Sequence, residues 1–317
     1  MKLTLVFFLI SWSIHIMGQS ALETGKKLYE DRRWVEAKKI FATIDDDQND
    51  FAAARYYLGR ITFDEKDFES AADYFEEALD TNDKIPDYHN WYGNALGSIA
   101  QEANVLRQGI LAPKMKNAWE KAISLSPNML EPRQSLVQYY LQAPGFMGGS
   151  TDKAKEMANQ ILKLDPADGH RQLGNIYLKE KKTMEAEKEF LAAVKINPEL
   201  ISVLANFYVS QKEYGKAFNL FEEEAKKHPD NMTAIYQIGR SSAISGQRLD
   251  RGEECLKKYL AYNPKSNEPS HAGANMRLAQ IQEKRGHRVE AKKLYETALR
   301  LDGSLKEAKE GLERMSN

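Results

Sequence analysis

Residues 173–198 read LGNIYLKEKKTMEAEKEFLAAVKINP, and the spacing of the small and aromatic residues in this stretch predicts the fold of most of the chain. Gly174 is followed by an alanine twelve positions later, Ala186, and by an aromatic residue sixteen positions later, Phe190. The same spacing returns in residues 204–229 and 278–303. Self-similarity of this kind indicates a chain built from repeated helix pairs.

The pattern continues toward the N-terminus, where Gly25, Gly59 and Gly93 are 34 residues apart. It resembles the tetratricopeptide repeat, a helix–turn–helix unit of 34 residues with small residues where its two helices cross. The resemblance implies an all-α, right-handed α-α superhelix of about eight helix pairs over residues 19–303. Its repeats lie near residues 19–51, 52–85, 86–129, 130–166, 167–197, 198–231, 232–271 and 272–303.

The last unit of such an array needs a cap, because one unit cannot bury its apolar face alone. Residues 304–317 suit that role, since Leu305, Ala308 and Leu312 form one apolar stripe among charged residues. We therefore expect a C-terminal capping helix there.

The N-terminus has the layout of a secretory signal peptide. Lys2 precedes an apolar run over residues 3–10, and small residues follow at Gly18 and Ser20. The alternatives are a membrane anchor or a buried first helix, but the run is too short to span a bilayer. We expect residues 1–18 to be removed, leaving an exported protein that is soluble in the periplasm or outside the cell, with no membrane span.

Charge and composition narrow the function classes. Lys and Arg number 45 and Asp and Glu number 46, so no basic field favours nucleic acid. The single cysteine, Cys255, permits no internal disulfide. The six histidines show no metal-ligand spacing, and no nucleophile motif is present. We expect no enzyme activity, no cofactor and no metal.

Two departures from the repeat period lie in the turns of the third and fourth pairs. The first insert is expected to close at Gly109 and Pro113 with Ile110 and Leu111 at its tip. The second, APGFMGG at 143–149, offers Phe146 and Met147, and it resembles an insert of exported bacterial tetratricopeptide proteins. It lacks the G-x-x-x-x-G-K-[ST] spacing of a phosphate loop.

Turns on one edge of a helix-pair array are neighbours, so we expect the two inserts to pack on each other. Two outcomes are open. The four apolar side chains form a local mini-core, or they form an exposed apolar edge that docks a partner.

The resemblance places the first helix of each pair on the concave face, with the residue after each crossing position facing the groove. All eight such residues are polar hydrogen-bond donors, and none is Asp or Glu. We expect Tyr56 and Tyr236 beside them to stack on side chains or sugar rings. The eight are Lys26, Arg60, Asn94, Gln138, Asn175, Asn206, Arg240 and Gln280.

The function predicted from these features is that of an exported, non-catalytic scaffold. It would bind a peptide or protein partner in the concave groove, and an envelope complex is one setting in which it would do so. The alternative is a structural or carbohydrate-associated component of the cell envelope.

Overall fold

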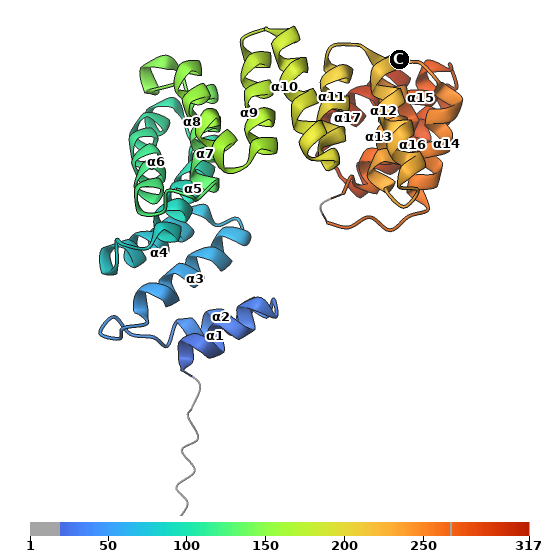
Figure 1. The fold of residues 1–317 in the computed structure, drawn as a ribbon. Coiled ribbons are helices and arrows are strands. Elements are labelled where there is room, and N and C mark those ends of the chain that lie inside the picture. The colour runs from blue at the N-terminus through green and yellow to red at the C-terminus, as the bar shows by residue number, and fades with distance from the viewer. Residues whose placement is uncertain (1–19, 267, 317) are drawn as a thin grey trace, which may run out of the picture. The chain divides into compact units, whose positions relative to one another are not determined.

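The computed structural model describes residues 20–266 and 268–316, and every regular element in those ranges is helical (Figure 1). The chain divides into two compact units, with the boundary between Met157 and Ala158. The predicted signal segment, residues 1–18, lies outside the described residues. Within the described residues, no helix is both long and apolar enough to cross a membrane.

The first unit is a series of helix pairs, in which we call the first helix of each pair helix A and the second helix B. Its last helix, α8, crosses the boundary. The elements are α1 (Ala21–Glu30), α2 (Trp34–Phe41), α3 (Phe51–Asp64), α4 (Phe68–Thr81), α5 (Pro86–Glu102), α6 (Val105–Leu125), α7 (Glu131–Gln142), the short 3-10 helix η1 (Gly145–Met147) and α8 (Thr151–Leu164).

The second unit repeats the plan with four helix pairs and one further helix. The elements are α9 (Pro166–Lys179), α10 (Thr183–Ile196), the 3-10 helix η2 (Pro198–Leu200), α11 (Ile201–Ser210), α12 (Tyr214–Lys227), α13 (Met232–Ser245), α14 (Leu249–Leu260), α15 (His271–Lys284), α16 (Arg288–Leu301) and α17 (Lys306–Ser316). The prediction of helix pairs in series is confirmed.

A close contact recurs in several helix pairs: a ring on helix B lies against a glycine on helix A. In the pair of α13 and α14 the helix-B side chain is Leu256, which lies against Gly239. A Cβ atom added to Gly174 would lie 2.7 Å from the Phe190 ring, and one added to Gly59 would lie 2.6 Å from Phe75. These distances are shorter than van der Waals contact, so the glycines allow the helices to approach. The sixteen-residue spacing in the sequence separates the two residues that make this contact.

The third pair keeps the contact although its sequence is longer. Trp119 takes the place of the ring, and a Cβ atom added to Gly93 would lie 2.6 Å from its indole nitrogen. The extra residues therefore lie between Gly93 and Trp119 in the sequence and leave their contact intact.

The insert of the third pair is helical almost throughout. Helix A of this pair runs on beyond its usual length, since α5 ends at Glu102. The prediction that Ile110 and Leu111 form the tip of a turn is wrong, because α6 begins at Val105 and contains both of them. The Asn104 side chain accepts a hydrogen bond from the backbone N–H of Arg107 at 3.0 Å and starts the helix there.

The insert of the fourth pair is a turn, as predicted. Gly148 has a φ of 95°, in the region that favours glycine, and a Cβ atom added to Gly149 would lie 1.8 Å from the carbonyl oxygen of Ala143. The Ser150 hydroxyl accepts a hydrogen bond from the backbone N–H of Lys153 at 3.3 Å and caps α8. The glycines are thus required by the backbone conformation of this turn.

Helix α17 caps the second unit, which confirms the predicted C-terminal cap. Leu305, Ala308 and Leu312 pack in one cluster with the buried ring of Tyr295 on α16. A Cβ atom added to Gly311 would lie 2.3 Å from that ring, so α17 approaches α16 as closely as the helices of a pair approach each other.

The contact between the two helices of a pair predicts that substitution of two glycines changes stability by different amounts. Gly174→Leu forces a side chain into the space of the buried Phe190 ring, and it should lower the free energy of unfolding by about 3 kcal/mol, as overpacking does. The control is Gly215→Leu on α12, because a Cβ atom added there meets nothing within 4 Å. Urea unfolding followed by far-UV circular dichroism measures both. Equal stability of the two variants would contradict the role of the contact.

Candidate functional site

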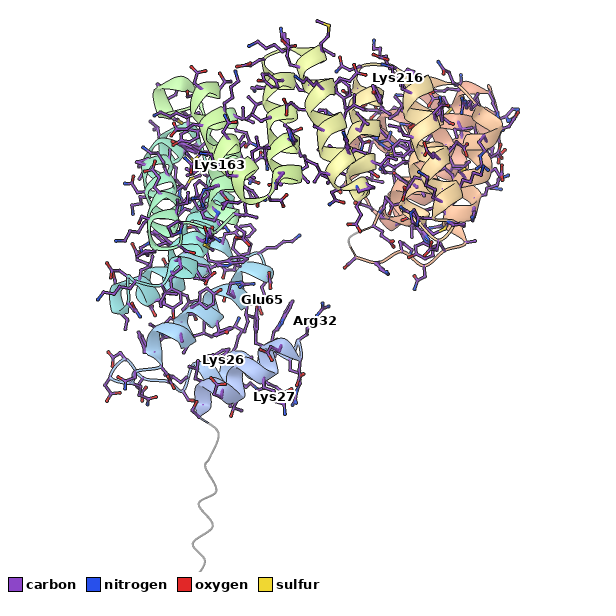
Figure 2. The ribbon with its side chains drawn as sticks, in the orientation of Figure 1. Lys26, Lys27, Arg32, Glu65, Lys163 and Lys216 are labelled. Carbon is purple, nitrogen blue, oxygen red and sulfur yellow. The ribbon has the colours of Figure 1, made fainter. Side chains whose placement is uncertain are left out.

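The residues after the crossing positions lie on eight successive helices A, and we call them the post-crossing row. In the first unit they are Lys26, Arg60, Asn94 and Gln138, on α1, α3, α5 and α7. In the second unit they are Asn175, Asn206, Arg240 and Gln280, on α9, α11, α13 and α15. Figure 2 labels the first of them, Lys26 on α1, whose ammonium donates to Glu23 at 2.8 Å.

Arg60 is held by aromatic side chains. Its guanidinium carbon lies 3.7 Å from the centre of the Trp91 ring, and its Nη1 donates to the hydroxyl of Tyr56 at 2.9 Å. Tyr56 is stacked on Tyr88, with ring centres 5.0 Å apart, and burial raises its pKa. Arg60 forms no ion pair with an acidic residue anywhere in the described ranges. It is therefore a positioned positive charge without a counter-ion.

Asn94 has a packing role that the sequence did not indicate. Its carboxamide oxygen accepts hydrogen bonds from the Trp119 indole N–H at 3.0 Å and from the Ser135 hydroxyl at 3.2 Å. It thereby joins α5, α6 and α7. A buried indole N–H needs an acceptor, and this requirement of Trp119 is the sequence signal that could have found the bond. Gln138, by contrast, is exposed and accepts from Gln142 at 3.0 Å.

Arg240 is the counterpart of Arg60 in the second unit, held by amides rather than rings. Its Nη1 donates to Asn206 Oδ1 at 3.1 Å and to Gln237 Oε1 at 3.4 Å. Burial, and then the positive charge of Arg277, lower the pKa of Arg240. Within residues 20–266 and 268–316, Arg240 has no ion pair with a carboxylate. The structure thus joins two predicted residues, Asn206 and Arg240, across adjacent helices.

Beside Arg240, a carboxylate is already bound. Glu307 on α17 accepts from Arg277 Nη1 at 2.5 Å and Nη2 at 3.1 Å, and from Gln280 Nε2 at 3.1 Å. These bonds, from Arg277 first, lower the pKa of Glu307. Sequence reasoning included Gln280 but missed Arg277, although the two lie three residues apart on one face of α15.

Two predicted residues occupy less open positions than expected. Tyr236 is buried, with its ring centre 5.1 Å from that of Tyr259, so its ring is removed from the predicted groove surface. The reason is packing, since Tyr236 on α13 lies against the buried ring of Tyr259 on α14. Asn175 is partly buried on α9, one turn beyond Arg171, which is ion-paired with Asp168.

The four apolar insert residues separate into two groups. Ile110 and Phe146 are 64% and 81% exposed, whereas Leu111 is buried and Met147 is partly buried next to Gly109. The outcome therefore lies between a mini-core and an exposed patch. Val105 and Leu106, which sequence reasoning did not single out, are exposed at the start of α6. We call the exposed set the apolar edge, and it comprises Val105, Leu106, Ile110 and Phe146.

The remaining reactive side chains form no cluster with an evident chemistry. No group of three or more metal-ligating side chains occurs among the residues that the structure describes. The Cys255 thiol is buried, and burial raises its pKa to about 11. A thiol with so high a pKa is a poor nucleophile near neutral pH.

Family models match two segments of this helical array. Residues 22–95 and residues 172–200 match models described as tetratricopeptide repeat. Both segments are thus similar to the tetratricopeptide repeat family. They contain the glycine–ring contacts of Gly25, Gly59 and Gly174.

The chain is also similar to a curated protein, the DnaJ homolog subfamily C member 7 homolog of Schizosaccharomyces pombe, with 22% identity over 254 residues. The match takes in 73% of this chain and 53% of that protein. This chain therefore spans about half the length of that relative.

Two solved structures share the fold. A tetratricopeptide repeat protein from Parabacteroides merdae has a TM-score of 0.55 at 15% identity, covering 84% of this chain and 99% of that one. A monomeric mutant of IFIT1, solved with Gppp-AAAA, has a TM-score of 0.55 at 15% identity, covering 92% of this chain and 70% of that one. At such identities the likeness shows the fold alone.

The bonds of Asn94 predict a loss of stability when they are removed. Asn94→Ala leaves the buried Trp119 N–H without an acceptor, which should lower the free energy of unfolding by about 1–3 kcal/mol. The exposed row residue Gln138 is the control, since Gln138→Ala should change it by less than about 0.5 kcal/mol. If chemical denaturation showed equal changes, Asn94 would have no such packing role.

Proposed function

We propose that this protein is an exported, non-catalytic scaffold that binds peptide or protein segments at the post-crossing residues of its units, and that these segments carry acidic groups. The proposal depends on the hydrogen-bond partners of Arg60 and Arg240. Each guanidinium is positioned by uncharged neighbours and lacks an acidic partner among the described residues. A positioned arginine suits a carboxylate, because its fork of donors matches two carboxylate oxygens.

The neighbours of the two arginines support a peptide ligand. Asn175 and Asn206 carry both a donor and an acceptor, which is what a peptide backbone needs. The fold supports it as well, because stacked helix pairs create extended binding surfaces. The nearly balanced charge of the chain argues for such local recognition and against a general attraction for nucleic acid.

Export is part of the proposal and is supported by the N-terminal sequence. Residues 1–18 have the charged start, apolar run and small residues of a secretory signal. The cysteine content is compatible with export, since a single buried thiol forms no internal disulfide.

A peptide array tests the groove. Decapeptides rich in Glu and Asp should bind better than matched peptides with Gln and Asn. Arg240→Ala should weaken that binding about tenfold, the value of a lost charge-assisted hydrogen bond. Arg300→Ala, at an exposed position on α16, is the control and should bind as the wild type does. No preference for acidic peptides, or full binding by Arg240→Ala, would contradict the proposal.

The apolar edge is a second candidate contact surface, because large exposed apolar side chains gathered at one place often mark a binding site. Replacing Ile110 and Phe146 by Ser should remove at least one protein captured from an envelope extract. The control replaces Met184 and Val289 by Ser, since these are exposed singly in the second unit at 82% and 83%. An identical set of captured proteins for all variants would show that the apolar edge is not a binding surface for proteins of the extract.

A further inference from the structure

The second unit binds a carboxylate of its own on the helix-A face. Glu307 belongs to the C-terminal helix α17, but its side chain reaches α15 and receives three donor contacts from Arg277 and Gln280. Gln280 belongs to the post-crossing row. The donors at this end of the row thus accept a carboxylate in the geometry that an acidic ligand would need.

The two side chains of this ion pair differ in their exposure to solvent. The Arg277 side chain is 12% exposed, whereas the Glu307 side chain is 54% exposed. The arginine is therefore fixed in the wall of helices, and the carboxylate is the member that can leave for water. A ligand carboxylate would replace that of Glu307, so Arg277 would keep an ionic partner during the exchange.

Glu307 also acts on the neighbouring unpaired arginine. The positive charge of Arg277 disfavours the charged form of Arg240, while the negative charge of Glu307 favours it. A ligand carboxylate near Arg240 and Arg277 would therefore be repelled by Glu307 and would take over its role when Glu307 leaves. An acidic ligand at Arg240 and Arg277 would therefore compete with Glu307 for Arg277.

Helix α17 is held in place independently of Glu307. Its Gly311 lies against the Tyr295 ring, and its Arg314 donates to Glu283 at 2.7 Å and 3.1 Å. These contacts lie in the middle of the helix and near its C-terminal end. Loss of the Glu307 carboxylate thus changes the groove without removing the cap.

We propose that Glu307 is an internal competitor, a carboxylate of the C-terminal helix that occupies the Arg277–Gln280 end of the row and that an acidic peptide displaces. This inference rests on the proposed function, since it concerns the regulation of the same groove. Its expected consequence is that removing the Glu307 charge exposes a stronger site for acidic ligands.

The test uses the full chain and a fluorescein-labelled decapeptide of alternating Ala and Glu with blocked ends. Fluorescence anisotropy should show that Glu307→Gln binds it about fivefold more tightly than the wild type, as release of about 1 kcal/mol implies. Glu310→Gln removes the same charge from the same helix, near Lys306 rather than Arg277, and should stay within about twofold of the wild type. The Ala–Gln decapeptide should bind all three proteins equally weakly.

Two results overturn the inference alone. Equal affinity of Glu307→Gln and the wild type for the acidic peptide would show that Glu307 does not compete. Equal tightening in Glu307→Gln and Glu310→Gln would show a general charge effect. If Arg240→Ala weakens binding in either case, the proposed function stands. If no protein distinguishes the Glu peptide from the Gln peptide, both the inference and the acidic-ligand function are overturned.

Discussion

The architecture depends on one interaction, the seating of a large helix-B side chain against a small helix-A residue. The Phe41, Phe75 and Phe190 rings are almost fully buried, and the glycine opposite each leaves no room for even a methyl group. This contact sets the distance and the rotation of the two helices in a pair. Because the post-crossing residue is the next one along helix A, the same contact also determines which side chains form the row.

The two units hold an arginine side chain in place through different contacts. In the first unit the Arg60 guanidinium lies over the Trp91 ring and donates a hydrogen bond to the Tyr56 hydroxyl, so aromatic residues hold it in place. In the second unit Arg240 is hydrogen-bonded by the amides of Asn206 and Gln237. Both arrangements restrict the side chain without neutralising it. The entropy of ordering a long side chain is thus already lost before a ligand arrives, which favours binding.

Local spacing predicted the helix pairs and the cap, because the crossing contact recurs at fixed intervals in the sequence. It failed for the third insert, where Gly109 and Pro113 suggested a turn but the Asn104 cap starts a helix earlier and the helix continues through both. It also failed for the partners of row residues. Asn94 meets Trp119 only because an insert brings α6 into place, and Glu307 meets Arg277 only because α17 folds back on α15. Such contacts join residues too far apart for periodicity to reveal.

The claim that the post-crossing row is the binding surface is tested most directly by the arginine side-chain signals in an NMR titration of isotope-labelled protein with the acidic decapeptide. The account predicts that the Nε–Hε signals of Arg240 and Arg277 shift with saturation, while that of Arg300 on α16 stays in place. Shifts confined to arginines of the helices B, or no shift at Arg240 under saturating peptide, would contradict it.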